Sequence, residues 1–423
     1  MKKLVSLLLA LVLLMAALPA AMADEDIKLT YWSSTILETP EGAFEQQVID
    51  GFNALDNGIT VEVVGVTSAD LVTKATSGAT TGELPDFTMG TPSVFSTLYD
   101  LEAVVPLEET AIDAEFLSTF TDMSREAFKG EDGNHYGVPF FMNPYGVVYR
   151  IDLFEEAGIE VPKTWDEFVQ ACQTLTHDGK YGMAMVGVRN TSGEARFQYL
   201  ARMFGVREFY QDENGQWATD LNGEAFATAL KNFTDLNLTY QVCQPGALET
   251  AYPDAVKLLS SGTCAILITG SNALGAILKQ APELEGKLGS FMLPASENGA
   301  IAYSGFGFFV TTEDAEKQAA ISQLLQYWLS VENQIAFAAQ SGRLPTRKDA
   351  LSDPSIQEIV GLKGYLETLN HLIYAPTIYG YSEINDIYGE AYSSVMAGEV
   401  TLEEAVNAAY ERAQLIVEEA NAQ

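Results

Sequence analysis

Side chains suited to binding a neutral, hydroxyl-rich ligand recur along the sequence, at the ends of predicted strands and in loops. Aromatic rings offer flat apolar faces on which sugar rings stack, and neutral polar side chains hydrogen-bond to hydroxyl groups. For each aromatic residue taken alone, a place in the hydrophobic core is the alternative. The candidates are the aromatic residues Trp32, Phe140, Phe141, Tyr145, Phe306, Tyr379 and Tyr381 and the polar residues Ser33, Ser68, Thr91, Asn143, Ser271 and Asn272.

Three further candidates are less specific. Asp86 follows a proline at a predicted strand start, so it either stabilises the fold or contacts a ligand. Arg343 follows a glycine and is either a residue between domains or a ligand clamp. Gly305 and Gly307 lie in a strand pattern and lack the later glycine and the Lys-Ser/Thr pair of a phosphate-binding loop. Gly305 is therefore kept as a contact to the same ligand and not to a nucleotide.

The sequence gives little support for a metal site or for catalytic residues. His135, His177 and His371 are isolated and share no helix-face spacing, so we predict no metal site and no cofactor. Acidic residues are so frequent that a glycosidase-like carboxylate pair could be chosen at will. We therefore predict a protein without catalytic residues, and a secreted glycosidase stays the alternative from another class.

The net charge limits the partners. The formal charge of −35 becomes −37 when Lys2 and Lys3 are removed with a predicted signal peptide. Such acidity argues against nucleic acid or an anionic membrane as a partner. A solvated acidic surface explains the charge, and a polyamine or another cationic solute is the alternative ligand.

The N-terminus predicts export. Lys2 and Lys3 precede an apolar run over 4–18, and Ala21-Met22-Ala23 is a small-x-small pattern that signal peptidase accepts. The run is shorter than the ~20 residues that a membrane-spanning helix needs. We expect a signal peptide over 1–23 and a periplasmic or secreted mature protein. No cysteine lies near this junction to carry a lipid.

The three cysteines do not form a recognisable framework. Cys172, Cys243 and Cys264 lack the paired spacing of a zinc site, and their odd number leaves at least one unpaired. Cys172 falls on the apolar face of a predicted helix and is expected in the core. Whether Cys243 and Cys264 form a disulfide stays open.

The first hundred residues predict an α/β unit. Strands are expected over 27–32, 59–66 and 85–89, with a helix after Thr39-Pro40 and another from Ser68. This β-α-β-α-β order predicts a largely parallel sheet, in which ligands lie beyond the carboxyl ends of the strands. That rule selects Trp32, Ser33, Ser68 and Thr91 from the candidates.

The run from Asp132 to Leu175 carries the densest local signals, including a predicted strand over 145–149, a helix ended by Gly158 and a Thr164/Glu167 capping box. It resembles the signature region of the extracellular solute-binding proteins of ATP-driven sugar importers, the group typified by maltose-binding protein. Other motifs follow in the order of that family: Gly82-Glu-Leu-Pro85-Asp86, Leu98-Tyr-Asp-Leu101, Gly305-Phe-Gly307-Phe, Ser341-Gly342-Arg343-Leu344-Pro345 and Gly398-Glu-Val-Thr-Leu-Glu-Glu-Ala405.

The resemblance implies an α/β fold of the periplasmic-binding-protein type, with two discontinuous lobes joined by a three-segment hinge. Lobe 1 would comprise 24–138 plus 290–340, and lobe 2 would comprise 143–288 plus 345–423. The crossings would lie near 139–143, 288–291 and 340–345.

The implied function is that of a monomeric receptor. It would capture a carbohydrate, in the size class of an oligosaccharide, between its lobes and deliver it to the permease subunits of an ABC importer.

Overall fold

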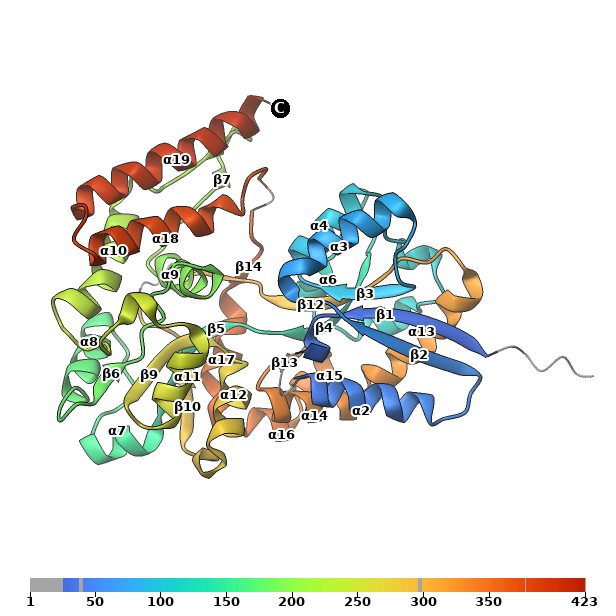
Figure 1. Ribbon diagram of the computed structural model, residues 1–423, viewed down its shortest axis with the longest axis horizontal. Coiled ribbons are helices and arrows are strands. Elements are labelled where there is room, and N and C mark those ends of the chain that lie inside the picture. The colour runs from blue at the N-terminus through green and yellow to red at the C-terminus, as the bar shows by residue number, and fades with distance from the viewer. Residues whose placement is uncertain (1–25, 38–40, 296–298, 377, 423) are drawn as a thin grey trace, which may run out of the picture.

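A computed structural model describes residues 26–37, 41–295, 299–376 and 378–422. The chain forms the predicted α/β architecture of two lobes, each built on its own β-sheet. Figure 1 shows the lobes side by side, with β4 (Gly137–Met142) in one and β5 (Tyr145–Arg150) in the other. The predicted signal peptide and the helix start at Thr39-Pro40 lie outside the described residues.

The first lobe contains a six-stranded sheet in the order β13-β4-β12-β3-β1-β2. β1 pairs in parallel with β2 and β3, which confirms the parallel sheet expected from the β-α-β-α-β order. β12 joins antiparallel to β3 and β4. The remaining bounds are β1 (Ile27–Ser33), β2 (Ile59–Gly65), β3 (Phe87–Gly90), β12 (Gly305–Val310) and β13 (Leu344–Pro345).

Helices cover both faces of this sheet because its strands carry apolar side chains on both sides. Tyr31 points to the face covered by α2 and α13, where its ring stacks on Phe87 at 4.5 Å and meets the edge of Trp328. The next residue, Trp32, points to the opposite face, among side chains of α3 and α4. The helices of this lobe are η1 (Thr35–Leu37), α2 (Glu41–Asn53), α3 (Ser68–Thr81), α4 (Pro92–Asp100), η2 (Leu107–Glu109), α5 (Ala114–Ser118), α6 (Asp122–Glu126), α13 (Ala315–Trp328), α14 (Val331–Ser341) and α15 (Lys348–Leu351).

The second lobe contains a four-stranded sheet in the order β10-β5-β9-β6, with one large core around it. Its strands are β5, β6 (Tyr181–Met183), β9 (Cys264–Gly270) and β10 (Leu288–Phe291), and β7 (Tyr210–Gln211) and β8 (Trp217–Ala218) form a separate hairpin. Its helices are α7 (Ile151–Ala157), α8 (Trp165–Thr174), α9 (Thr191–Met203), α10 (Glu224–Leu238), η3 (Ala247–Glu249), α11 (Tyr252–Ser260), α12 (Ala273–Gln280), η4 (Pro282–Leu284), α17 (Lys363–Thr368), η6 (Leu369–His371), α18 (Glu383–Met396) and α19 (Leu402–Ala422).

Two of the three hinge crossings lie later than expected. The first is the two-residue link 143–144 between β4 and β5, because residues 139–142 of the predicted 139–143 segment belong to β4. Residues 288–291 form β10, whose short apolar strand pairs antiparallel with β5, so the chain leaves the second lobe only after Phe291. On the way to β12 it forms β11 (Ile301–Ala302), which pairs in parallel with β14 (Leu372–Ile373).

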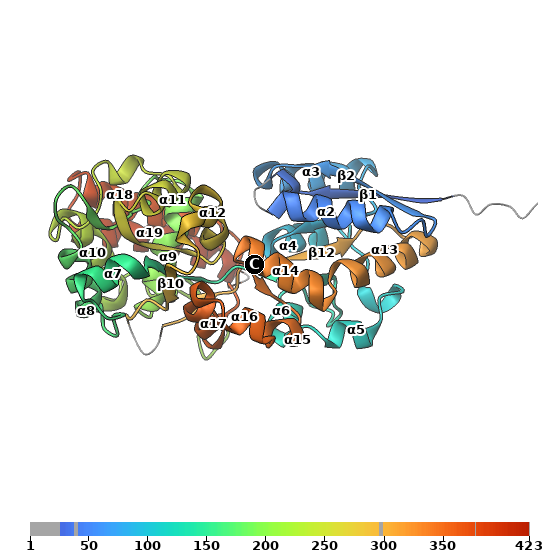
Figure 2. The same ribbon diagram turned by 90° about the horizontal axis from the view of Figure 1, so that it is seen from below.

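The third crossing is also displaced from the predicted 340–345. β13 pairs with β4, and the Lys348 N–H donates to the Thr119 carbonyl at 2.9 Å, which keeps this stretch in the first lobe. The chain reaches the second lobe at α17, where the Gly364 N–H donates to Ser290 Oγ at 2.9 Å. The crossing therefore spans α16 (Pro354–Gln357) and η5 (Val360–Leu362), and Figure 2 shows α16 in the lower part of the view, between α17 and α15.

Local signals in the sequence match the helix ends. Gly158 ends α7 in the left-handed region at φ 66°, and Thr164 Oγ1 accepts a hydrogen bond from the Glu167 N–H at the start of α8. The Glu167 carboxylate bonds to the N–H of Lys163 and not to that of Thr164, so the capping box is shifted by one residue. Cys172, Cys243 and Cys264 are all buried free thiols, which answers the open disulfide question for this structure.

Among the described residues, none of the helices is both long and apolar enough to cross a membrane.

Candidate functional site

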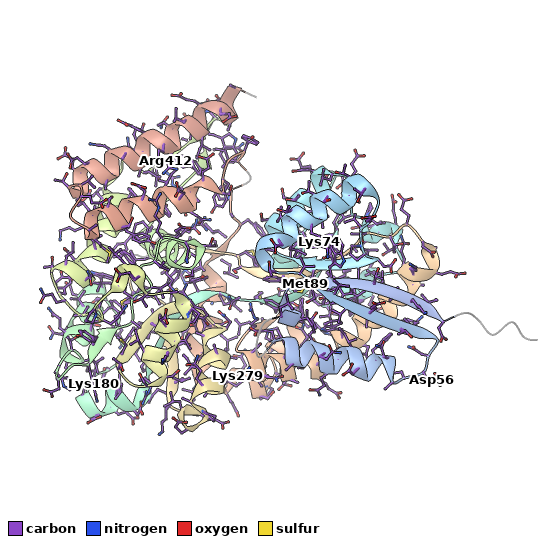
Figure 3. The ribbon with its side chains drawn as sticks, in the orientation of Figure 1. Asp56, Lys74, Met89, Lys180, Lys279 and Arg412 are labelled. Atoms are coloured by element: carbon purple, nitrogen blue, oxygen red, sulfur yellow. The ribbon has the colours of Figure 1, made fainter. Side chains whose placement is uncertain are left out.

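The carboxyl end of β1 faces the second lobe (Figure 1). Ser33 at this end is fully buried and its Oγ donates to Glu45 Oε2 at 2.9 Å, while Thr35 Oγ1 donates to the same oxygen at 2.6 Å. Thr35 also contacts Met89 Sδ at 3.2 Å, and Figure 3 shows Met89 on the side of the first lobe turned towards the second. The Ser33 hydroxyl is thus engaged within its own lobe.

Next to this cluster lies a buried ion pair. Arg343 Nε donates to Glu41 Oε1 at 2.8 Å, and both side chains are about one-twentieth exposed. The Arg343 guanidinium carbon lies 4.4 Å from the centroid of the Phe141 ring, a cation–π distance. Arg343 therefore belongs to the first lobe, at the strand that precedes the third crossing.

Asn143, at the first crossing, connects the two lobes. Its Oδ1 accepts hydrogen bonds from Ser271 Oγ at 3.2 Å and from the Asn272 N–H at 3.0 Å. Asn272 Nδ2 in turn donates to Tyr252 Oη at 3.2 Å. Three residues chosen from the sequence, Asn143, Ser271 and Asn272, are brought together here.

The second lobe contributes a guanidinium between tyrosine rings. The Arg196 Cζ lies 4.8 Å from the Tyr252 ring centroid and 6.0 Å from that of Tyr145. Arg196 Nη2 donates to Thr269 Oγ1 at 3.0 Å and Nη1 donates to the Ser192 carbonyl. The α9 helix presents Arg196 one turn inside its N-terminus, beside the carboxyl end of β9.

Groups of both lobes act on Tyr252. Burial raises the pKa of its hydroxyl to about 12, the charges of Arg196 and Arg343 lower that pKa, and the charge of Glu41 raises it. Since Arg343 and Glu41 belong to the first lobe and Arg196 to the second, Tyr252 lies where the charged groups of the two lobes meet. We call Glu41, Asn143, Tyr145, Arg196, Tyr252, Asn272 and Arg343 the inter-lobe site.

Trp32 lies outside this site. Its side chain is 8% exposed in the core formed by α3 and α4, and the Lys74 Nζ lies 4.3 Å from its ring centroid. Figure 3 shows Lys74 on α3, above the sheet of the first lobe. Successive side chains of a strand point to opposite faces of the sheet, so the Trp32 ring points into this core although the residue lies near the carboxyl end of β1.

Phe140 and Phe141 are also covered. Phe140 stacks on Phe337 at 4.9 Å inside the core of the first lobe. Phe141 lies between Arg343 and the partly buried Phe306, whose ring stacks on it at 4.8 Å. A Cβ at Gly305 would lie 2.6 Å from the Phe141 carbonyl oxygen, so this glycine permits close strand packing.

Asp86 lies at the opposite end of its strand. Its carboxylate accepts hydrogen bonds from the Thr30 N–H at 2.7 Å and from Lys317 Nζ at 2.8 Å, at the amino end of β3. Thr91, in contrast, follows the carboxyl end of β3 as the N-cap residue of α4, and is partly buried. Ser68 is the first residue of α3, and its side chain lies outside what the structure describes.

The two C-terminal tyrosines have different surroundings. Tyr381 Oη accepts hydrogen bonds from Arg202 Nη2 at 2.7 Å and from Gln198 Nε2 at 3.1 Å, beside the buried Arg202–Glu208 ion pair of the second lobe. Tyr379 is 65% exposed. Neither makes a described contact with the inter-lobe site.

Sequence reasoning missed Glu41, Arg196 and Tyr252. All three lie in helices or at a helix start, where a charged or aromatic residue is read as part of a solvated or core face. Arg196 could have been identified only by comparing the faces of its helix residue by residue. The helix is buried on most sides, and the nearby Glu194 and Phe197 are buried as well.

Two surface cavities lie elsewhere, both beside Tyr181 of the second lobe. Their volumes are about 210 Å³ and 400 Å³. One is lined by His177 and Lys180 and the other by Asp254 and Lys257, and the described residues that line them all belong to the second lobe. They combine no charged groups of the two lobes, so the inter-lobe site remains the better candidate.

Comparison with known proteins identifies the family. The model of the family described as bacterial extracellular solute-binding protein matches residues 47–364. The chain belongs to that family. This solute-binding protein is 25% identical to a putative binding protein of Brucella abortus over 364 residues, which cover 84% of the chain and 85% of the relative.

Two further similar proteins have described ligands. The solute-binding protein is 23% identical to an arabinooligosaccharide-binding protein of Halalkalibacterium halodurans, over 74% of the chain and 67% of that protein. A solved ABC transporter solute-binding protein of Thermotoga lettingae, bound with α-D-tagatose, superposes with a TM-score of 0.76 at 21% identity, covering 92% of this chain and 100% of that one. The second likeness shows the two-lobe fold, in agreement with the fold expected from the sequence.

Proposed function

We propose that this solute-binding protein captures a carbohydrate, in the size class of an oligosaccharide, between its lobes and delivers it to the permease of an ABC importer. The observation that carries the proposal is the geometry at the first crossing. Asn143 accepts hydrogen bonds from Ser271 and Asn272, and Asn272 donates to Tyr252, whose ring lies 4.8 Å from the Arg196 guanidinium carbon. The ligands of the Halalkalibacterium and Thermotoga proteins support a sugar as the solute.

The side chains of the inter-lobe site fit this ligand class. The partly buried rings of Tyr145 and Tyr252 offer apolar faces to the C–H groups of a sugar ring. The partly buried amides of Asn143 and Asn272 combine donors and acceptors, as hydroxyl groups require. A ligand that contacts both lobes binds the closed form better than the open one, and this difference in affinity limits how far it shifts the population towards closure.

The alternatives are less well supported. A polyamine would need carboxylates free to receive its ammonium groups, whereas the Glu41 carboxylate already pairs with Arg343 and Arg196 adds a positive charge nearby. A glycosidase would need a pair of carboxyl groups flanking the bond to be cleaved. The proposal therefore includes no reaction and no catalytic residue.

A thermal-shift screen of the mature protein tests the proposal. Neutral and acidic oligosaccharides, monosaccharides and polyamines form the panel. A ligand at one hundred times its dissociation constant stabilises the folded state by about 2.7 kcal/mol. Tyr252→Ala should remove the stabilisation by the sugar, while Tyr210→Ala, on the β7–β8 hairpin, should keep it. A panel in which only polyamines shift the midpoint would exclude the sugar.

We also propose that the protein is exported. Signal peptidase would cleave after Ala23 and leave an unlipidated protein that begins at Asp24. Intact mass of the exported protein measures both points, and a diacylglyceryl adduct or retained Lys2 and Lys3 would contradict them. We also propose a monomer, which light scattering coupled to size exclusion checks directly.

A further inference from the structure

Arg196 differs from the other arginines of the chain. All nine arginines lie within the described residues. Eight of them form an ion pair with an aspartate or glutamate, including the buried Arg202 and Arg343. For Arg196, no carboxylate of a described residue lies within 4 Å, although its side chain is only 5% exposed.

Burying a guanidinium without a counter-charge is costly. Removing an ion from water costs several kcal/mol unless an opposite charge and hydrogen bonds compensate for it. Arg196 has partial compensation from Thr269 Oγ1, the Ser192 carbonyl and the faces of two tyrosines. Its Nε is buried and has no hydrogen-bond partner among the described residues. Arg196 is thus a buried cation whose hydrogen bonding is incomplete, and its burial lowers the stability of the folded protein.

The position of this cation is that of a ligand-binding group. Arg196 lies beside Tyr252 and Tyr145 in the inter-lobe site. The only other guanidinium of the site, Arg343, already pairs with Glu41 across 2.8 Å. An anionic group placed between the lobes would therefore find one guanidinium that is neutralised and one that is not.

We propose that the solute is an acidic sugar, such as a uronic-acid-containing oligosaccharide, and that Arg196 binds its carboxylate. This inference rests on the proposed function and names the ligand class of the same site. Arg196 would discriminate by charge, because a neutral sugar leaves the buried cation without a counter-ion. The acidic surface of the protein, at a formal charge of −35, does not attract such a ligand over long distances, so selectivity arises from the short-range pair.

Titration calorimetry with matched ligands tests the inference. The probes are trigalacturonate and glucuronic-acid-substituted xylotriose, each compared with its own methyl ester, in which the negative charge is removed. At least one acid should bind the wild-type protein about ten- to a hundredfold more tightly than its ester, as expected for a charge-assisted hydrogen-bonded pair. Arg196→Gln should reduce this ratio to near one.

Two controls separate charge recognition from folding. Arg189→Gln removes an arginine just before the same helix, paired with Asp386 and 43% exposed, and should leave the acid-to-ester ratio unchanged. The unliganded Arg196→Gln protein should unfold at the wild-type temperature or above it, since an uncompensated buried charge has been removed. A large fall in that temperature would assign Arg196 to folding and overturn the inference.

The remaining outcomes are distinct. If a neutral oligosaccharide of the panel or an ester binds as tightly as the acids, or if Arg196→Gln retains the acid preference, this inference is wrong while the proposed function stands. If no neutral or acidic sugar binds and a polyamine does, the proposed function is wrong and the inference falls with it.

Discussion

Arg343 and Glu41 form a buried ion pair at 2.8 Å between residues separated by 302 positions in the sequence. The pair connects the first turn of α2 with the residue before β13, so it holds the last strand of the first lobe beside the inter-lobe site. The partner that defines the role of Arg343 is this distant in the sequence, so the sequence left open both an inter-lobe role and a ligand clamp.

Breaking this pair should destabilise the protein. Arg343→Met leaves the Glu41 carboxylate buried without its partner, and the free energy of unfolding should fall by about 3 kcal/mol. Urea denaturation measures the change. The double variant Glu41→Gln/Arg343→Met removes both charges and should recover part of the loss. Equal stability of the wild type and the single variant would show that the pair contributes nothing.

Trp32→Ala should affect folding and not ligand affinity. The indole is 8% exposed in the core beneath α3 and α4, so its removal should cost about 3–5 kcal/mol of unfolding free energy. Calorimetry with a sugar found by the thermal-shift screen should give an affinity close to wild type. Tyr379→Ala, at a ring that is 65% exposed, is the matched control and should change stability by less than about 0.5 kcal/mol. A weakened affinity with intact stability would return Trp32 to the ligand site.

Ligand binding should bring the lobes together. A sugar that contacts Tyr252 in one lobe and the neighbourhood of Glu41 in the other stabilises the closed arrangement. The radius of gyration from small-angle X-ray scattering should therefore fall at saturation. The Tyr252→Ala variant should keep the unliganded radius at the same ligand concentration. A constant radius in the saturated wild type would mean a rigid site.

Acid should weaken the packing of α18 against its neighbours. Hydrogen bonds from Arg189 and from Arg412 lower the pKa of Asp386, even though partial burial opposes them. Because the pKa in the folded state is below that in the unfolded state, the stabilisation is complete above about pH 4 and is lost as the pH falls through the lowered folded value. The carboxylate is 54% exposed, so its contribution is less than about 1 kcal/mol.

Asp386→Asn tests this linkage by urea unfolding at two pH values. The variant should be slightly less stable than the wild type at pH 7, and the difference should shrink as the pH falls through the lowered pKa of the folded state, because the wild-type carboxyl group is then protonated as well. High salt should also reduce the difference at pH 7 because these side chains are exposed. A difference that persists unchanged in acid would rule out the charge as its cause.

The sequence predicted those features that depend on neighbouring residues. Gly158 ends a helix because it adopts the left-handed conformation, and Thr164 caps α8 by accepting a hydrogen bond from the Glu167 N–H. The parallel order of the first three strands followed from helix and strand alternation. These signals act within a few residues, so they can be read without knowledge of the tertiary structure.

The features that sequence reasoning missed depend on distant contacts. Arg196 and Tyr252 are separated by 56 positions and become neighbours only through the packing of α9 and α11 around β9. Phe140 was proposed as a ligand contact, whereas its ring packs on Phe337 of a helix that follows much later. The crossings moved because β10 and β13 pair with β5 and β4, and strand partners cannot be derived from short apolar runs.

The two ends of the described chain belong to different lobes. β1 starts at Ile27 on the side of the first lobe remote from the second, and α19 ends at Ala422 in the second lobe (Figure 1). Any change in the angle between the lobes therefore alters the distance between the two ends. A donor fluorophore fused at one end and an acceptor at the other would convert sugar capture into a change in energy transfer, which makes this chain a ready scaffold for a genetically encoded reporter of its own ligand.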